Sequence, residues 1–555
     1  MTGTPTWFGP PDRRLFGWLH LPDDRGVRGI AVVCPPLGHE EANALPALQC
    51  LCDRLADGGV GALRFSYGGT GDSAGSWGQT GRLADWLSSV DEAVLLARRA
   101  HGGAVVLIGL RMGALLAAEA VARGAKVEGL VQWDPCLSGR DFLRVERTLS
   151  ATGYGARQAG DGSVAGPAFT FAEDAVAELS TLDLIPPGPT ATHATVVLAR
   201  AGSRVVSRQG AFADSPAEWA EIGGQPELLD VPPDMLTLPD ATIETICRWT
   251  DRAVDGPHTP VTFRPVDSAE VARTGDGRSI VEQPVWLGPH RLFGMITDPA
   301  GPGRPEPNTV VFLSAGALDH TGPGRMWVEL ARQLAVEGIR SIRADVDGIG
   351  ESFGRPGQPR QVPKAPEAID DVVELAQSFD HRDGRNVILV GLSSGAYHAI
   401  EAGLRLRLSG ICAVNPGLTS WVPEVDRGDI DPRRLAYRPM PPALQALAVR
   451  HSRVATGAWR ALLQLWVKRS ATDGVVGVSR RGTPVLLIAS QADAEQFEPS
   501  LYWSFVRRGQ HRRGLLDVEI VPGSDHSLYT VDSQGRAYPI LVRWLLSHCA
   551  ETSDG

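Results

Sequence analysis

The chain has 555 residues, and at roughly 100–200 residues per domain this length predicts two to four domains. Hydrophobic residues make up 43% and charged residues 21%, which is typical of a packed soluble protein. The formal charge of −10 at pH 7 argues against a nucleic-acid-binding surface as the main function, and no apolar run approaches the ~18 residues that span a bilayer.

The first half of the chain alternates short apolar runs with helical segments. Continuous apolar runs of this length suit strands that are buried on both faces of a parallel sheet. We predict strands at 30–34, 61–66, 104–110, 130–134 and 194–200. An insertion at about 137–193 separates the last two of these strands and is the first half's counterpart of a cap.

The second half repeats this alternation after a stretch rich in Pro, Gly, Asp and Thr. We expect this stretch, 253–280, to be a linker between a first domain, 1–252, and a second domain, 281–549. Strands are predicted at 309–314, 340–345, 386–392, 410–416, 483–490 and 516–522, with helices such as 325–338 and 366–380 between them. The insertion at about 417–482 is too long for a direct connection and is expected to form a cap.

The two halves carry matching landmarks in the same order. RFSYGGTGDSAG at 64–75 resembles RADVDGIGESFG at 343–354, and GLRMG at 109–113 resembles GLSSG at 391–395. The matching segments lie a whole domain's length apart, which indicates a duplicated domain rather than a short structural repeat. The sequence therefore predicts two tandem α/β domains, each a doubly wound and mostly parallel sheet with a cap insertion.

The second pentapeptide has the pattern of a nucleophile elbow. It lies between a predicted strand and a predicted helix, so Ser393 would occupy a sharp turn with its hydroxyl projecting from the sheet edge. Gly391 and Gly395 are needed because side chains there would collide with the adjacent strand and helix. An unactivated serine is a poor nucleophile, so a base and an acid are required.

Two later strand ends supply that base and acid in the expected order. Asp493 follows the strand at 483–490, and His526 follows the strand at 516–522. We expect His526 to accept the proton of Ser393 and Asp493 to orient and stabilise the imidazole. Glu495 and Glu498 are alternatives for the acid.

The oxyanion hole requires two backbone N–H donors. We expect one from Ser394, directly after the nucleophile, and one from Ala317 in the loop after the strand at 309–314. The residues expected to contact substrate are the loop residues Gly316, Leu318 and His320 and the cap residues Trp421 and Trp459, together with Trp466. Two alternatives stay open: His320 orders its own loop, and each tryptophan packs the cap on the core.

These motifs carry a resemblance to a known family. On GLSSG at 391–395, the run DGIGES at 347–352, Asp493 and the Asp525–His526 pair, the region 275–549 resembles an α/β-hydrolase of the serine aminopeptidase and esterase group. The resemblance implies the α/β-hydrolase fold and hydrolysis or transfer of an acyl group through an acyl-enzyme on Ser393. It implies no metal and no organic cofactor.

The first half resembles a branch of α/β-hydrolase-like proteins with arginine at the elbow. Arg111 replaces the nucleophile, while Ser203 and Met235 align with the acid and the base of the second half. Arginine stays protonated and is no nucleophile, so we expect a catalytically inactive copy. Arg111 is expected to pair with Glu40 or Glu41, or alternatively to bind an anion of the substrate or of an acyl carrier.

The sequence thus predicts a serine hydrolase or acyltransferase that acts on an ester or thioester, either a small molecule or a carrier-bound acyl group. A non-catalytic binding protein built from two hydrolase folds, or a cofactor-free perhydrolase or lyase on the same fold, remains an alternative. The seven cysteines are scattered and the first residues lack a signal-peptide pattern, so we expect reduced thiols and a cytoplasmic protein. A homo-oligomer is compatible with the sequence.

Overall fold

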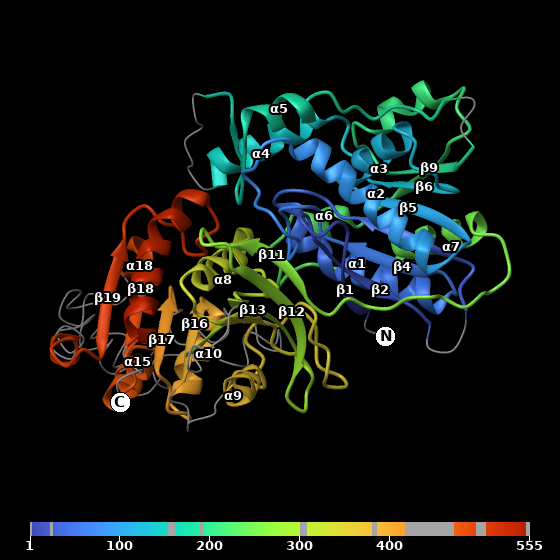
Figure 1. The fold of residues 1–555 in the computed structure, drawn as a ribbon. Helices are drawn as coiled ribbons and strands as arrows, with labels where there is room; N and C mark the ends of the chain where they lie inside the picture. Colours follow the sequence, from blue (N-terminus) through green and yellow to red (C-terminus); the bar gives the residue numbers. More distant parts are fainter. Residues whose placement is uncertain are drawn as a thin grey trace, which may run out of the picture.

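The computed structural model describes residues 3–22, 26–153, 161–188, 192–299, 308–379, 386–416, 471–494 and 507–550. Within these ranges the chain forms two α/β domains that lie against each other (Figure 1). Each domain is built around its own sheet, with helices packed on both faces. None of the described helices is both long and apolar enough to cross a membrane.

The first domain contains an eight-stranded sheet in the order β1-β2-β4-β3-β5-β6-β9-β10. Its strands are β1 Thr4–Phe8, β2 Leu15–His20, β3 Gly29–Cys34, β4 Gly61–Phe65, β5 Ala104–Leu110, β6 Gly129–Trp133, β9 Ala194–Arg200 and β10 Glu218–Ile222. Its helices are α1 Glu40–Asp57, α2 Arg82–Ala100, α3 Met112–Ala122, α4 Gly139–Gly153, α5 Glu173–Leu179, α6 Gln225–Leu229 and α7 Asp240–Ala253.

The second domain contains a nine-stranded sheet in the order β11-β12-β13-β15-β14-β16-β17-β18-β19. Its strands are β11 Ala269–Arg273, β12 Ser279–Leu287, β13 Leu292–Pro299, β14 Thr309–Leu313, β15 Ser341–Ala344, β16 Val387–Leu392, β17 Gly410–Val414, β18 Val485–Ser490 and β19 Leu516–Val521. Its described helices are α8 Met326–Val336, α9 Ala368–Ser378, α10 Ser394–Gly403, α15 Ala471–Arg480, α16 Gln491–Ala494 and α18 Val531–Ala550.

The strand orders confirm the predicted duplication of one fold. Strand for strand, β1-β2-β4-β3-β5-β6-β9-β10 corresponds to β12-β13-β15-β14-β16-β17-β18-β19, and β11 is added at the edge of the second sheet. In both sheets an antiparallel hairpin precedes the parallel strands. Each predicted strand is found within two residues of its expected ends, because these runs are buried on both faces of the sheets.

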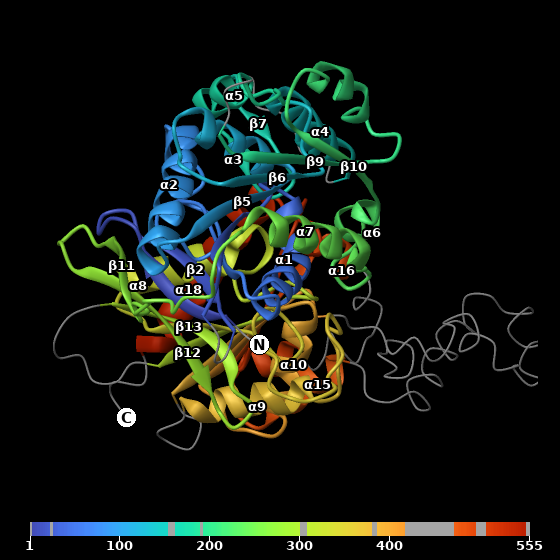
Figure 2. The same cartoon turned by 90° about the vertical axis from the view of Figure 1, so that its right-hand side faces the viewer.

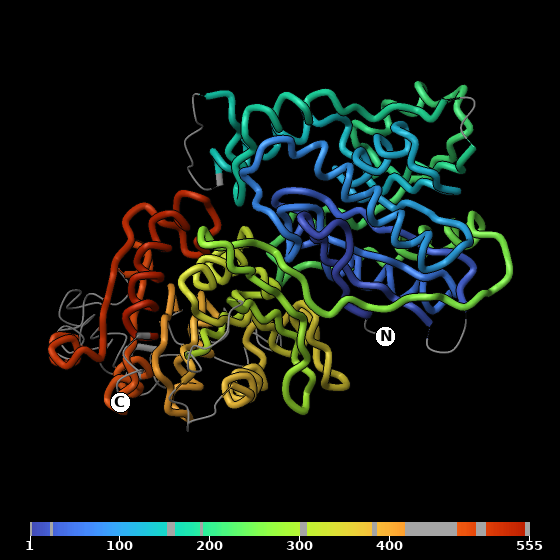
Figure 3. The backbone as a smooth tube through the Cα atoms, in the orientation of Figure 1, coloured from blue at the N-terminus to red at the C-terminus, as the bar shows by residue number. Residues whose placement is uncertain are grey.

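The expected linker is shorter than its composition indicated. β11, Ala269–Arg273, lies inside the range 253–280 but pairs with β12, so it belongs to the second sheet. The segment before it runs back along the first domain (Figure 3), where Thr259 pairs with Val27 and the Thr262 amide donates to the Ala100 carbonyl. The second domain therefore begins near residue 269 rather than 281.

The two insertions differ in what the structure describes. In the first domain the insertion contains α4 and α5 together with the short strands β7 Val164–Ala165 and β8 Thr170–Phe171. In the second domain most of the predicted cap, 417–470, lies outside the described residues. Its end forms α15, whose Gly474 and Gly477 lie against side chains of α10 and of Leu404 just beyond it.

The interface between the domains is formed by their hairpins and adjoining loops (Figure 2). Trp18 on β2 contacts Phe293 on β13 with 5.0 Å between ring centroids, and Trp286 on β12 lies 6.2 Å from Trp18. Trp7, Phe16 and Met295 are buried in the same apolar cluster. Burying large aromatic side chains from both sheets gives the two domains a shared core.

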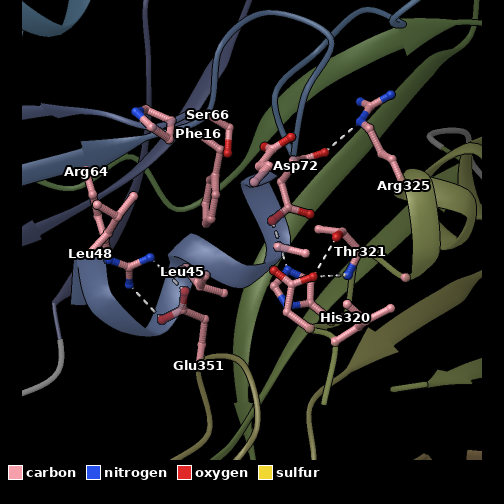
Figure 4. A pocket seen from close by; sticks show the side chains of 18 of the residues that line it. Phe16, Leu45, Leu48, Arg64, Ser66, Asp72, His320, Thr321, Arg325 and Glu351 are labelled. Atoms are coloured by element: carbon pink, nitrogen blue, oxygen red, sulfur yellow. Dashed lines mark hydrogen bonds and ion pairs between the residues drawn. The ribbon is translucent and has the colours of Figure 1, made fainter. Parts of the chain in front are cut away.

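Two buried ion pairs lie beside this cluster and are related by the duplication. Arg64 donates two hydrogen bonds of 2.7 Å to Glu351 (Figure 4), and Arg343 lies 3.1 Å from Asp72. The alignment of 64–75 with 343–354 makes Arg64 equivalent to Arg343 and Asp72 equivalent to Glu351. The interface is therefore reciprocal: each domain offers the same arginine and the same acidic position to the other, as in a twofold-symmetric dimer.

Candidate active site

The turn between β16 and α10 has the geometry of a nucleophile elbow. Ser393 adopts φ 53° and ψ −112°, a sparsely populated conformation for a residue with a side chain. A Cβ atom on Gly391 would lie 2.2 Å from the carbonyl carbon of Gly395, and one on Gly395 would lie 2.5 Å from the Ser314 oxygen. Both glycines are therefore required for the strand and helix to approach this closely.

Three side chains predicted from sequence meet at this turn. His526, in the loop after β19, places Nε2 3.1 Å from Ser393 Oγ. Its Nδ1 lies 2.9 and 3.0 Å from the two carboxylate oxygens of Asp493 on α16. Asp493 is nearly buried, whereas the His526 side chain is 49% exposed. The arrangement joins a hydroxyl, a base within hydrogen-bond reach and an acid that orients the base.

Neighbouring groups lower the pKa of Asp493 and raise the pKa of His526. Burial alone would raise the pKa of Asp493, but hydrogen bonds from His526 and Ser490 outweigh it and hold that pKa below the usual range. The hydrogen bond to Asp493 raises the pKa of His526 above its usual value, against the opposing effect of burial. His526 is therefore a stronger base than a free imidazole.

Asn415, which we did not predict as a site residue, connects the acid and base loops. It follows β17 with φ 43°. Its amide donates to the His526 carbonyl at 2.6 Å, and its side-chain oxygen accepts from the Ser490 backbone N–H at 2.7 Å. Because Ser490 Oγ in turn donates to Asp493 at 2.5 Å, Asn415 fixes the loops that carry both residues.

Replacing Asn415 with alanine is expected to lower kcat/KM on an activated ester by about ten- to a hundredfold, because displacement of reacting groups by about 1 Å has effects of this size. The measurement is p-nitrophenyl acetate hydrolysis. Asn386→Ala is the matched control, since Asn386 is also buried but lies at the opposite end of β16, where it donates to the Phe379 carbonyl. Equal rates for the two folded variants would contradict the positioning role.

The loop after β14 approaches the elbow, and the loop and the elbow each contribute one backbone N–H that no described residue accepts from. The Gly316 N–H donates to Ser394 Oγ at 2.8 Å, and the Leu318 N–H donates to the Ala315 carbonyl at 3.1 Å. Within the described part of the chain, the N–H groups of Ser394 and Ala317 make no hydrogen bond. These are the two donors expected for the oxyanion hole, so Gly316 serves instead to attach the loop to the elbow.

The expectation that His320 contacts substrate is wrong. Its ring is 3% exposed, with Nδ1 2.9 Å from Asp345 and Nε2 2.9 Å from Asp72 of the first domain. Both nitrogens are occupied by carboxylates, which raise the pKa of His320 well above its usual value although burial opposes them. Figure 4 shows this contact at the domain interface.

Of the other predicted substrate contacts, Gly316 and Leu318 lie in the described part of the chain. Leu318 lines a cavity of about 110 Å³ in the interface, beside His320 and Arg325. Trp421, Trp459 and Trp466 lie outside the described residues. Within the described residues, Ser393, Asp493 and His526 are thus brought together, whereas Leu318 faces the interface cavity.

The elbow of the first domain has nearly the same backbone conformation as the elbow of the second domain, but a different side chain. Arg111 has φ 55° and ψ −118°, and its Nε donates to Glu40 at 2.8 Å. Its Nη1 donates to the carbonyl and carboxylate of Asp134 at 3.0 and 3.1 Å. The pairing with Glu40 is confirmed, whereas Glu41 faces the interface cavity. Met235, at the position aligned with the base, is 69% exposed.

One cluster of described residues has the composition of a metal site. Ligand atoms of His290, Asp371 and Glu374 lie within 4.8 Å of one another. His290 Nδ1 is already 2.6 Å from Glu374, and Arg355 pairs with Asp371. Because a guanidinium and an imidazole already partner the carboxylates, we interpret this cluster as a partly buried ion-pair network of the second domain.

The two doubly wound sheets and the elbow at the end of β16 define a protein of the α/β-hydrolase fold. Residues 310–537 match the family model described as the Alpha/beta hydrolase family. No curated protein matches the sequence.

The solved structures that are similar to this chain cover about half of it. They include the α/β-hydrolase GrgF from Penicillium sp. sh18, with 18% identity, 51% of this chain and 98% of that chain covered, and a TM-score of 0.29. Dienelactone hydrolase from Anabaena variabilis has 13% identity, coverage of 49% and 98%, and a TM-score of 0.30. A thermostable esterase from Pseudomonas putida has 15% identity, coverage of 49% and 83%, and a TM-score of 0.31.

Proposed function

We propose that this protein is a serine hydrolase or acyltransferase that acts on an ester or thioester through an acyl-enzyme on Ser393. The observation that carries the proposal is the 3.1 Å contact of Ser393 Oγ with His526 Nε2, in a histidine whose Nδ1 lies 2.9 Å from Asp493. A hydroxyl, an oriented base and two free amides at one sheet edge are the parts that acyl transfer requires.

In the proposed reaction, Ser393 Oγ attacks the acyl carbon while His526 Nε2 accepts its proton. The oxygen of the tetrahedral intermediate takes the negative charge and is stabilised by the N–H groups of Ser394 and Ala317. Asp493 stabilises the imidazolium. His526 then returns the proton to the leaving alcohol or thiol as the bond to the acyl carbon breaks.

The acyl group leaves Ser393 by the same steps in reverse order. His526 removes a proton from water or from an alcohol, amine or thiol acceptor, which attacks the acyl carbon and displaces Ser393. A water-accessible site gives the free acid, and a site that excludes water and admits another acceptor gives transfer. In the first domain the corresponding position is held by an ion-paired arginine, which supports a non-catalytic role for that domain.

A fluorophosphonate probe tests the proposal directly. We expect covalent labelling of the full chain, located on Ser393 by mass spectrometry and abolished in Ser393→Ala. A panel of p-nitrophenyl esters and acyl thioesters, read for free acid and for transfer to added alcohols, then distinguishes hydrolysis from transfer. Absence of labelling together with inactivity on the whole panel would favour the non-catalytic binding protein.

The activity is expected to rise with pH through a single ionisation above 6.5. Only neutral His526 accepts the serine proton, and the hydrogen bond with Asp493 raises the pKa of His526 above its usual 6.5. Activity is therefore lost as pH falls through this raised pKa. The measurement is kcat/KM between about pH 5 and 9. In Asp493→Asn the fluorophosphonate reaction is expected to be slower, with its midpoint at lower pH; an unchanged midpoint would contradict this cause.

A further inference from the structure

The first domain has an open cleft at its own elbow, the position that corresponds to Ser393 in the second domain. This Arg111 cleft has a volume of about 450 Å³ and is lined by His39, Glu40, Arg111, Asp134, Arg200 and Ser203, with Asp141, Arg144 and Arg204 among its further lining residues. Its walls come from the loop before α1, the elbow before α3, the start of α4 and the loop after β9. The cleft occupies the position of an active-site pocket in this fold, but other residues replace the catalytic groups.

Several polar atoms at this cleft have no partner. Glu40 is 4% exposed and uses only Oε1 for Arg111, while its buried Oε2 makes no hydrogen bond. The buried Oγ of Ser203 also lacks a partner. Within the described residues, Nη2 of Arg111 donates no hydrogen bond. Buried polar atoms are nearly always satisfied, so unpaired acceptors beside a free donor indicate a polar ligand.

His39 adds an oriented donor to the same cleft. Its Nδ1 lies 2.8 Å from Glu146 on α4, and its backbone N–H donates to the same oxygen at 3.2 Å. Gly38 makes room for this contact, since a Cβ there would lie 2.1 Å from Glu146. No described residue bonds Nε2 of His39, and the side chain is 18% exposed. Although burial would lower the pKa of His39, Glu146 raises it, which favours an N–H donor at Nε2.

The charges lining the cleft favour an anion. Four arginines and three carboxylates line it, an excess of one positive charge. At the mouth, Arg144 and Arg204 share the single carboxylate of Asp141. Arg200 is bonded to Asp134 at 2.9 Å, and Asp230, outside the cleft and exposed, lies 3.8 Å from it. A monoanion at the mouth would balance the excess, and planar guanidinium groups fit a carboxylate well.

We propose that the Arg111 cleft binds a small organic carboxylate that also carries a hydroxyl or amide N–H group. The carboxylate accepts hydrogen bonds from the arginines and His39. The hydroxyl or N–H donates to Glu40 Oε2, and Ser203 supplies a second polar contact. This site is separate from Ser393 and does not depend on the proposed reaction.

Isothermal titration of the full chain with matched acids tests the proposal. The probes are 2-, 3- and 4-hydroxybutyrate and N-acetylglycine, with butyrate as the acid that lacks the donor and glycerol 3-phosphate as the phosphate arm. We expect at least one donor-bearing acid to bind about fivefold or more tightly than butyrate, because one hydrogen bond has about this effect. Because the cleft has only one excess positive charge, glycerol 3-phosphate is expected to bind more weakly than the donor-bearing acids. Tighter binding of the phosphate than of these acids would overturn the choice of a carboxylate.

Variants locate the binding. Ser203→Ala and Arg204→Ala are each expected to weaken binding about fivefold or more, because each removes a group that lines the cleft. Arg208→Ala removes an exposed arginine outside the lining and is expected to leave binding unchanged. Ser393→Ala should also bind normally, which separates this site from the catalytic one. No binding of any probe at about 20 mM, or equal binding by Arg204→Ala, would overturn the proposal.

Discussion

Ser393→Ala is expected to lower kcat on esters by about four to six orders of magnitude while leaving the fold intact. The hydroxyl has no structural duty: its contact is with His526 at 3.1 Å, and the turn is held by its backbone and by Gly391 and Gly395. Without the nucleophile, only binding and the oxyanion donors contribute, which accounts for the residual rate. The measurement is steady-state hydrolysis of a p-nitrophenyl ester at saturating substrate.

The comparison variant is Ser378→Ala, in the same domain. Ser378 Oγ donates to the Glu374 carbonyl of its own helix α9, so its loss should leave kcat unchanged.

The double variant His526→Ala with Ser393→Ala is expected to be little less active than either single variant, because the two side chains act as one unit. Additive losses, or a rate in Ser393→Ala close to that of the wild type, would remove Ser393 from the mechanism.

The meeting of Ser393, Asp493 and His526 was predictable because each of them follows a strand end. The C-terminal ends of parallel strands meet at one edge of a sheet, so Ser393, Asp493 and His526 were expected together although they are far apart in sequence. Asn415 also follows a strand end and was missed. Its role depends on two hydrogen bonds to other loops, and only the Asn-Pro pair with an equivalent Asp-Pro at 134–135 marked the position in the sequence.

The residues that face the other domain were the least predictable. His320 lies in the loop that is expected to supply an oxyanion donor, and this position alone favoured a substrate contact. Its actual partner, Asp72, comes from the first domain, 248 residues away. Likewise Glu146 reaches His39 across 107 residues. Sequence patterns specify which face of an element is buried, but not which side chain of a second domain or cap lies opposite it.

The edge strands β10 and β11 escaped prediction for a different reason. β11 reads AEVAR and β10 reads EWAEI, so each mixes charged with apolar residues and is only partly buried. Such short mixed runs resemble loops more than they resemble the continuous apolar runs of the central strands. β11 also lies within the stretch whose Pro, Gly, Asp and Thr content indicated a linker.

The duplication explains the interface as well as the fold. Helices, turns and sheet order are repeated, and so is the arginine on the strand that ends just before the glycine-rich loop: Arg64 on β4 and Arg343 on β15. Each arginine crosses to the acidic residue at the equivalent loop position of the other domain. The first domain thus contributes charge compensation to the interior of the second, which is a structural reason for retaining both domains in one chain.

Removing either partner of the Arg64–Glu351 pair is expected to destabilise the protein by about 3–5 kcal/mol, because the remaining charge stays buried without compensation. The side chains are 8% and 7% exposed, so water does not replace the lost partner. Arg64→Leu and Glu351→Leu should each lower the thermal midpoint of unfolding, whereas the double variant should lose less than the sum, since an apolar pair of similar volume leaves no unpaired charge. Gln49 also donates a hydrogen bond to Glu351, so its contribution to stability can be measured by the same thermal unfolding.

The matched control is the surface pair of Glu119 and Arg123 on the first domain, where the arginine side chain is 56% exposed. Arg123→Leu is expected to change stability by about 0.5 kcal/mol or less, because solvent screens an exposed ion pair. If Arg64→Leu had an equally small effect, the buried pair would contribute nothing beyond a surface contact. If the double Leu variant were destabilised by the full sum, the cost would come from lost packing rather than from an uncompensated charge, and the reciprocal pairs would not be what joins the two domains.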